Sequence, residues 1–224
     1  MATETIRTCD EHGPFSGDRC PVCEAPGTHL LSGERRRRLS KYTSGALRHF
    51  PEDAGLELDE RGWTDYGDLV AAADEKYGWA TEARVGGVIA TDPKGRFERT
   101  GTTGDGDGSG RVRAAYGHSV DVTLEPTEAP VPDELFHGTA PTHVGSIRGE
   151  GLRPMSRQQV HLSADRETAA SVGRRHSDDP VVFAVDAAAM LADGRRIAKR
   201  GTQTYTTDRV PPEFLERVTD ESET

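Results

Sequence analysis

Four residues near the amino terminus have the types and the spacing of a metal site. They form two pairs, Cys9-x2-His12 and Cys20-x2-Cys23, with seven residues between the pairs. Thiolates and imidazoles are the ligands that tetrahedral zinc prefers, and a two-residue spacing lets both side chains of a pair reach one ion. Four protein ligands leave no open position, so we predict a structural zinc, with His29 as an alternative to His12. Free thiols are the competing interpretation.

A second chemical signal is an Arg-His pair, Arg48-His49, at the end of a predicted helix. A cation at a helix C-terminus interacts favourably with the helix dipole and stabilises the helix by about 0.3–1 kcal/mol. The pair could therefore serve only to stabilise the helix end. Arginine also holds phosphate through two parallel hydrogen bonds, and histidine titrates near neutral pH. Similar residue types recur farther along: Arg113, Gly117-His118-Ser119, His137-Gly138-Thr139, Arg157, His161-Leu162-Ser163 and Gly173-x-Arg175.

Apolar spacing predicts the elements that position the first of these residues. A helical pattern opens with the basic run 35–38 and ends before Pro51. Two further helices are predicted to begin at the caps Asp65 and Thr81. Two short strands, 96–99 and 111–114, then flank a Gly- and Asp-rich hairpin tip over 100–110. Helices followed by a hairpin predict a winged-helix-like lobe over residues 35–124.

The second half of the chain alternates between strands and helices. A proline-containing linker over 125–132 precedes it. Strands are predicted at 135–137, 159–162, 181–185, 195–199 and 202–206, and helices at 142–148 and 165–175. We therefore expect an α+β protein: a small irregular zinc module over 1–34, the lobe over 35–124, and a second lobe over 133–224.

Composition limits the classes of function. The 224 residues carry 28 Lys+Arg against 38 Asp+Glu, a net charge of −10. This balance disfavours non-specific nucleic-acid binding, although a local arginine site remains compatible with it. An acid-rich surface with only four lysines is typical of salt adaptation (a halophilic source). Without a long apolar run or an export signal, we expect a monomeric cytoplasmic protein that does not enter membranes.

Several motifs in a fixed order identify a protein family more specifically than any one of them. The chain carries Arg48-His49, Gly55-Leu56-x-Leu58-Asp59-x-x-Gly62-Trp63, Lys94-Gly95-Arg96-Phe97-Glu98, Arg113-Ala114-x-x-Gly117-His118-Ser119, Phe136-His137-Gly138-Thr139, Gly151-Leu152-x-x-Met155-x-Arg157-x-x-Val160-His161-Leu162-Ser163 and Val172-Gly173-x-Arg175-His176. From about Leu39 to about Leu215 it resembles the RNA 2′-phosphotransferase (KptA) family.

The resemblance implies a fold and a reaction. The fold would be a winged-helix-like lobe followed by an ADP-ribosyltransferase-like lobe with a mixed sheet. The reaction would remove an internal 2′-phosphate from RNA, possibly tRNA during splicing, with NAD as co-substrate. Its products would be RNA with a 2′-hydroxyl, nicotinamide and ADP-ribose 1″,2″-cyclic phosphate.

The resemblance also assigns roles to residues. The family's catalytic set matches Arg48, His49, Arg113 and Arg157. Its NAD-binding motifs match His118, Ser119, His137, Gly138, Thr139, His161, Leu162, Ser163, Gly173 and Arg175. Lys41, Lys94 and Arg96 would contact RNA. This chain departs from the family pattern at Ala115-Tyr116, where Asn-Gln is usual, and in an acidic Gly-rich insertion over 104–110.

Two alternatives remain at this stage. The first alternative is an ADP-ribosyltransferase that modifies either the terminal phosphates of nucleic acid or a protein. It would need the same NAD lobe. A zinc and winged-helix nucleic-acid-binding protein would need no NAD at all. NAD binding distinguishes the second alternative from both enzymes, and the product formed on RNA distinguishes the enzymes from each other.

Overall fold

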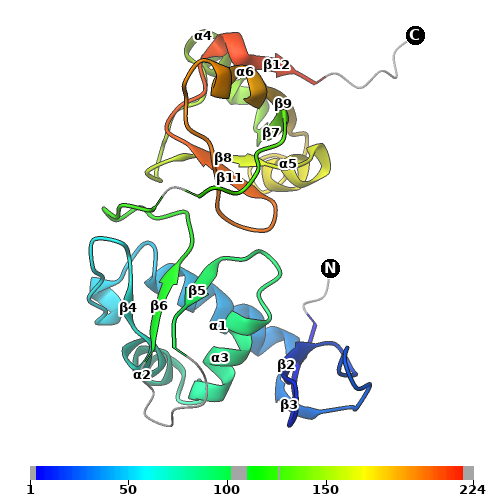
Figure 1. Cartoon of the computed structure of the whole chain (residues 1–224), viewed down its shortest axis with the longest axis vertical. Helices are drawn as coiled ribbons and strands as arrows, with labels where there is room; N and C mark the ends of the chain where they lie inside the picture. The colour runs from blue at the N-terminus through cyan, green and yellow to red at the C-terminus, as the bar shows by residue number, and fades with distance from the viewer. Residues whose placement is uncertain (1–3, 102–109, 126, 219–224) are drawn as a thin grey trace. The chain divides into compact units, whose positions relative to one another are not determined.

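The computed structural model describes residues 4–101, 110–125 and 127–218. These residues form two compact units, one within residues 1–124 and one within 125–224 (Figure 1). Most of the predicted hairpin tip, most of the Gly-rich insertion and one position of the predicted linker, residue 126, lie outside the described residues. Each unit has its own hydrophobic core.

The first unit opens with a small antiparallel sheet. Its strands are β1 (Ile6–Cys9), β2 (Gly13–Ser16) and β3 (Thr28–Leu31), in the order β2-β1-β3. The prediction of an irregular module was therefore wrong, because strands of four residues are too short to give a clear alternating pattern. Pro14 fits because β2 is an edge strand, where a missing N–H costs little. Ile6 and Leu31 are fully buried in the core that the following helices share.

Three helices build the rest of that core. They are α1 (Gly33–Ala46), α2 (Tyr66–Tyr77) and α3 (Glu82–Ala90), with a 3-10 turn, η1 (Glu52–Ala54), after the first. The predicted cap Asp65 is confirmed, since its carboxylate accepts from the backbone N–H of Gly67 at 2.7 Å. Thr81 does occupy the cap position of α3, but within the described residues its side chain makes no capping bond.

A second small sheet completes the first unit. It has the order β4-β6-β5, with β4 (Thr64–Asp65), β5 (Phe97–Arg99) and β6 (Arg111–Ala114). The predicted hairpin is confirmed, and its register pairs Glu98 with Arg113. That register places a carboxylate directly across from one of the predicted catalytic arginines.

The second unit is built on a six-stranded sheet in the order β10-β11-β8-β7-β9-β12. The strands are β7 (Glu134–Thr139), β8 (Val160–Ser163), β9 (Val181–Asp186), β10 (Ala198–Lys199), β11 (Thr204–Thr207) and β12 (Leu215–Arg217). Every described pairing is antiparallel, so the prediction of a mixed sheet was wrong. Strands β8 and β9 do run in the same direction, but β7 lies between them.

Short helices accompany this sheet. They are η2 (Pro141–His143), α4 (Val144–Glu150), α5 (Arg166–Gly173), α6 (Ala187–Ala192) and η3 (Pro212–Phe214). The predicted helices at 142–148 and 165–175 are confirmed with small shifts, whereas α6 and β12 were not predicted. Among the described helices, none has the length and apolar character needed to cross a bilayer.

Candidate functional site

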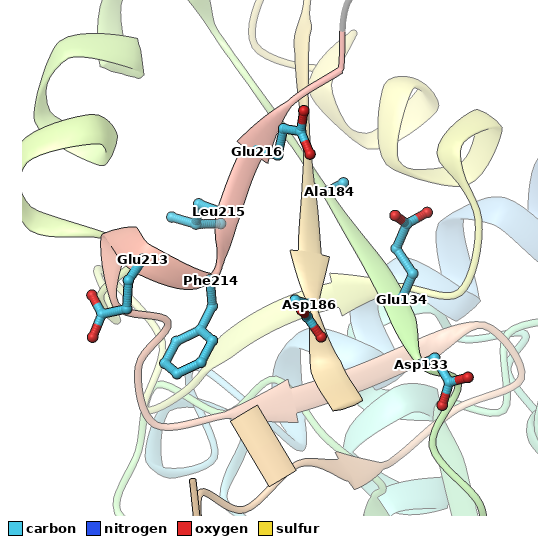
Figure 2. A pocket seen from close by; sticks show the side chains of 8 residues that line it. All are labelled: Asp133, Glu134, Ala184, Asp186, Glu213, Phe214, Leu215 and Glu216. Carbon is cyan, nitrogen blue, oxygen red and sulfur yellow. The ribbon is translucent and has the colours of Figure 1, made fainter. Parts of the chain in front are cut away.

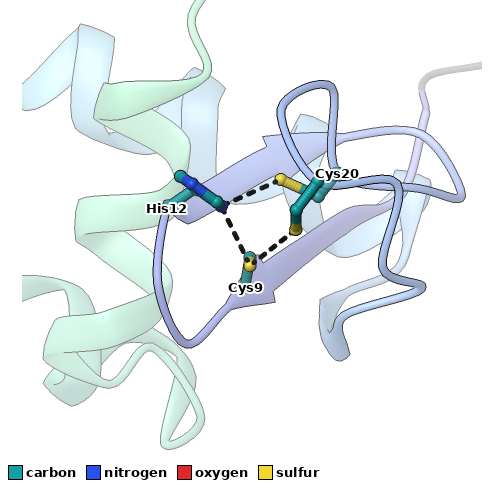
Figure 3. Close-up of side chains that lie close together, drawn as sticks. Cys9, His12 and Cys20 are labelled. Carbon is teal, nitrogen blue, oxygen red and sulfur yellow. Dashed lines mark hydrogen bonds between the residues drawn. The ribbon is translucent and has the colours of Figure 1, made fainter.

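The four predicted metal ligands lie together in the first unit. Their ligand atoms are all within 4.8 Å of one another. The Nδ1 atom of His12 lies 3.5 Å from Sγ of Cys9 and 3.7 Å from Sγ of Cys20 (Figure 3). His29 stands on β3 opposite Arg7 and is not part of this group.

The spacing of these atoms fits a tetrahedral zinc ion. The sulfur atoms of Cys9 and Cys23 are 3.6 Å apart, far beyond a disulfide bond of about 2.05 Å. Two sulfurs at about 2.3 Å from a tetrahedral zinc are separated by about 3.8 Å. The backbone N–H of Glu11 and the ring of His12 lower the pKa of Cys9 to about 7, which favours the thiolate that zinc requires.

The Arg48-His49 pair is positioned where α1 ends. The carbonyl of Gly45 accepts from the backbone N–H groups of Arg48 and His49 at 3.1 and 2.8 Å. A Cβ atom at Gly45 would come within 2.4 Å of the Phe50 ring, so the ring packs directly against the glycine. Arg48 is buried and His49 is exposed.

Ser119 joins both residues of the pair. Its backbone N–H and its hydroxyl both lie at hydrogen-bond distance from the Arg48 carbonyl, 3.0 and 3.3 Å. Its Oγ atom also lies 3.0 Å from Nδ1 of His49. One hydroxyl proton cannot serve both partners, so a Ser119 that donates to the carbonyl accepts from Nδ1 of His49. Nε2 of neutral His49 is then an acceptor, which is the state a general base needs.

The neighbouring His118 is interior rather than surface-exposed. Its side chain is 2% exposed, and a Cβ atom at Gly62 would lie 3.3 Å from its Nε2 atom. His118 therefore packs beneath the turn that Asp59 stabilises by accepting from the N–H groups of Arg61 and Trp63. The resemblance assigned His118 and Ser119 to NAD binding. In the structure, Ser119 contacts His49, a predicted catalytic residue.

Arg113 is held on three sides. Its Nε atom donates to Oε2 of Glu98 at 2.7 Å, and its Nη1 atom donates to the Arg61 carbonyl at 3.3 Å. The guanidinium carbon lies 4.6 Å from the centre of the Trp63 ring. Glu98 and Trp63 fix the plane of a predicted catalytic arginine; both lie in the quoted motifs, but neither was assigned a role from the sequence.

The predicted RNA contacts differ in exposure. Lys41 and Lys94 are exposed. Arg96 donates from Nε to the Asp92 carboxylate at 3.0 Å and from Nη2 to the Ser40 hydroxyl at 2.8 Å. Its guanidinium is therefore committed to contacts within the unit, and binding of RNA by Arg96 stays a prediction.

In the second unit, two predicted NAD-motif histidines meet. Nδ1 of His137, on β7, lies 3.1 Å from the backbone carbonyl of His161, on β8. Burial lowers the pKa of His137 below its ordinary value of 6.5, so the ring is neutral at pH 7 and donates from Nδ1. Nε2 of His137 is then the acceptor.

The two predicted glycines of this unit make a close contact between β7 and α5. A Cβ atom at Gly138 would lie 1.9 Å from the Ala169 carbonyl oxygen, and one at Gly173 would lie 3.3 Å from the Thr139 nitrogen. Both positions therefore require glycine for packing. Thr139 ends β7 and is buried, and the cap position of the following 3-10 helix is Ala140.

Strand register places polar side chains on the face that carries α5. Ser163 lies opposite Phe136 on one side and Thr204 on the other, and His161 lies opposite Thr206. Thr206 is 2% exposed, and in the described part of the chain its Oγ1 atom has no hydrogen-bond partner. The alternation of β11 could have pointed to Thr204 and Thr206, but a four-residue strand gives a weak signal.

Of the remaining predicted residues, Leu162 is buried in the core of the second unit, whereas Arg157 and Arg175 are exposed. Arg157 lies in the bend that precedes β8, and Arg175 follows α5. Both belong to the second unit, whereas Arg48, His49 and Arg113 belong to the first.

A surface hollow of about 590 Å³ in the second unit contains none of the predicted residues (Figure 2). Its lining includes five carboxylates, from Asp133, Glu134, Asp186, Glu213 and Glu216. Such a lining repels phosphate groups, so the hollow is unsuited to RNA or to NAD.

Comparisons with known proteins give one consistent result. The family described as "RNA 2′-phosphotransferase, Tpt1 / KptA family" matches residues 34–209, so the match begins after the four metal-ligand candidates. A Haloarcula marismortui protein named "Probable RNA 2′-phosphotransferase" is 62% identical over 215 residues, which cover 95% of this chain and 97% of the relative. Proteins with similar names from Archaeoglobus fulgidus and Agrobacterium fabrum are 40% and 47% identical, over 92% and 82% of this chain and 90% and 95% of their own lengths.

Proposed function

The chain belongs to the RNA 2′-phosphotransferase, Tpt1 / KptA family, and on this premise we propose that it removes the 2′-phosphate from RNA with NAD as co-substrate. The products are RNA with a 2′-hydroxyl, nicotinamide and ADP-ribose 1″,2″-cyclic phosphate. The observation that carries the proposal is the arrangement at the end of α1, where Ser119 holds the buried Arg48 and the exposed His49. It supplies a fixed phosphate-binding group beside a proton-transfer group.

In the first step, an oxygen of the RNA 2′-phosphate attacks C1″ of the nicotinamide ribose, and nicotinamide leaves with the electrons of the broken bond. The substrate brings its own anionic nucleophile, so the protein has to hold the phosphate in line and exclude water. We assign that task to Arg48 and Arg113, whose guanidinium planes lie over Tyr116 and Trp63. Arg157 is assigned to the same task from its match to the family's catalytic residues.

In the second step, the ribose 2″-hydroxyl attacks phosphorus and the RNA 2′-oxygen leaves. The attacking hydroxyl loses a proton and the leaving oxygen gains one. Nε2 of His49 is the acceptor that takes the first proton, since Nδ1 faces Ser119. Fixed arginines stabilise the negative charge that develops on the phosphoryl oxygens.

The second unit is proposed to bind NAD and to be ADP-ribosyltransferase-like, while the first is winged-helix-like. Three helices, with β4 between the first two and the β5–β6 hairpin after the third, support the winged-helix assignment. The buried Thr206 hydroxyl and the polar row around Ser163 support a polar ligand on the α5 face. The remaining motif residues, including Arg175, are assigned to NAD by the family pattern alone.

The Cys9, His12, Cys20 and Cys23 group is proposed to hold one structural zinc ion, supported by its donor set and its distances. It takes no part in the reaction, because four protein ligands leave no open position. The net charge of −10 supports adaptation to high salt.

The test uses an RNA with one internal 2′-phosphate, in high salt, with and without NAD. We expect NAD-dependent loss of the phosphate, its abolition by Arg48→Ala, and unchanged activity for Arg37→Ala, an exposed arginine on α1. Accumulation of ADP-ribosylated RNA in the wild type would instead support the alternative transferase. Failure to bind NAD would overturn both enzymatic proposals.

A further inference from the structure

One surface of the first unit joins arginines of α1 to aromatic rings at the end of α2. The guanidinium carbon of Arg35 lies 5.0 Å from the centre of the Trp79 ring, and that of Arg38 lies 5.3 Å from the centre of the Tyr77 ring. Arg35, Arg38 and Tyr42 are spaced by three and four residues, so they share one face of the helix. We call these five residues the arginine–aromatic surface.

The rings of this surface contact one another in sequence. Tyr77 stacks on Trp79 at 4.9 Å between ring centres, and Tyr42 meets Tyr77 edge to face at 5.6 Å. Tyr42 also lies 6.1 Å from the ring of Phe50, the residue after His49. The rings therefore follow α1 from its amino-terminal half to the Arg48-His49 pair.

The two arginines make no ion pair with the described part of the unit. Both are exposed, and among the residues that the structure describes neither guanidinium has a hydrogen bond or an ion pair. Three other arginines, Arg96, Arg111 and Arg113, each pair with a carboxylate, whereas Arg84 donates to backbone carbonyls. An uncompensated cationic pair in a chain of net charge −10 marks a surface suited to an anionic partner.

We propose that the arginine–aromatic surface binds the RNA strand at a distance from the reacting 2′-phosphate. A guanidinium that lies flat on a ring keeps its N–H groups at the edge, where they can hold a phosphate with two hydrogen bonds. The ring fixes the plane and lowers the entropy lost on binding. The proposal rests on the proposed function, because it takes the RNA substrate as the partner.

The length of α1 sets how far from the reaction this contact lies. Ten residues separate Arg38 from Arg48, which is about 15 Å at 1.5 Å per residue. A stacked strand rises about 3.4 Å per nucleotide, so the span corresponds to about four nucleotides. A trinucleotide held at Arg48 is therefore too short to reach Arg38, whereas an RNA of about 20 nucleotides reaches it easily.

The chain offers a matched control for charge. Arg37 is adjacent to Arg38, exposed and likewise without a hydrogen bond or ion pair within the described ranges, but it is on a different face of α1 and contacts no ring. We would measure the binding of a labelled RNA of about 20 nucleotides by fluorescence anisotropy over a range of salt concentrations. Arg38→Gln should weaken binding roughly three- to tenfold and reduce the salt slope by about 0.7, while Arg37→Gln should change affinity less than about twofold.

Two further variants test the role of the rings. Trp79→Leu should weaken RNA binding without any change of charge, and Trp79→Phe should restore most of the affinity because a ring remains under Arg35. Thermal unfolding of each variant verifies that the unit still folds. Equal losses for Arg37→Gln and Arg38→Gln, or unchanged binding in Arg38→Gln, would overturn the proposal.

The same variants separate this proposal from the proposed function. Arg38→Gln should remove the 2′-phosphate from a trinucleotide at the wild-type rate and act more slowly on the long RNA at low concentration. A wild-type protein inactive on both RNAs with NAD present would contradict the proposed function. The anisotropy comparison would still report whether the surface binds RNA.

Discussion

Arg48 and Tyr116 form a buried cation–π pair, with the guanidinium carbon 4.8 Å from the centre of the ring. The Tyr116 hydroxyl donates to the carbonyl of Lys94 at 3.3 Å, which anchors the ring. The Arg48 backbone is held separately by Ser119. Backbone and side chain of a proposed catalytic arginine are thus fixed by two residues of one segment, 116–119.

Truncation of Tyr116 should impair the reaction without preventing folding. A partly desolvated cation–π contact is worth about 1–2 kcal/mol, so Tyr116→Ala should lower the rate of 2′-phosphate removal by roughly five- to thirtyfold. Tyr116→Phe keeps the ring and loses only the bond to Lys94, so its rate should stay near that of the wild type. Steady-state kinetics on one RNA substrate would compare the rates of the two variants. A Tyr116→Phe variant as slow as Tyr116→Ala would contradict the positioning role of the ring.

Glu98 should act as a positioning residue for Arg113. Glu98→Gln keeps an oxygen that can accept from Nε of Arg113, so we expect no more than a few-fold loss of activity. Glu98→Ala leaves the guanidinium with only the Arg61 carbonyl and the Trp63 ring, and we expect a loss of about tenfold or more. The ratio of the two variants' kcat values is the measurement, and equal activity in both would show that Glu98 does not orient Arg113.

The sequence predicts the parts of this fold that depend on neighbouring residues. The Asp65 cap and the hairpin around Arg113 are local, and both appear where expected. The contacts that fix the candidate site are not local. Tyr116 reaches Arg48 over 68 positions, and no periodicity encodes such a pairing. The antiparallel sheet was missed for the same reason, because β7, the first of these three strands in sequence, lies between β8 and β9 in the sheet.

Metal removal should destabilise the first unit as a whole. The ligand Cys9 ends the strand that begins with Ile6, and Ile6 is fully buried in the helical core. Metal binding and folding are coupled in such sites. We expect one zinc per chain by elemental analysis. A strong chelator, or Cys20→Ser, should lower the unfolding midpoint by about 10 °C, equivalent to roughly 3 kcal/mol.

His29→Gln is the matched control for this prediction, since His29 is an exposed histidine on β3 outside the ligand group. It should retain the full zinc content and the wild-type unfolding midpoint. Loss of zinc from His29→Gln but not from His12→Gln would show that the ligand assignment is wrong.

The half-buried His137 should make stability depend on pH. Its pKa is lowered in the folded chain from an ordinary value of 6.5, so the unfolded chain binds the additional proton first as the pH falls. Stability from this residue is therefore fully present above about pH 7 and is lost as the pH drops through 6.5, by at most about 1.4 kcal/mol per pH unit. His137→Asn keeps a donor for the His161 carbonyl and does not titrate. Denaturant unfolding between pH 5 and 8 should show a shallower slope for the variant, and parallel curves would contradict the assignment.

Gly138→Ala should be strongly destabilising. The new methyl group would lie 1.9 Å from the Ala169 carbonyl oxygen, which is α5 backbone and cannot rotate away. Either β7 or α5 must shift, at a cost of about 3 kcal/mol or more. Gly145→Ala in α4 is the control, because no described heavy atom lies within 4 Å of the added methyl, and helix propensity should make it neutral or stabilising by up to about 1 kcal/mol. Denaturant unfolding of the two variants should therefore give effects of opposite sign or very unequal size, and similar stabilities would mean that β7 and α5 do not pack through Gly138.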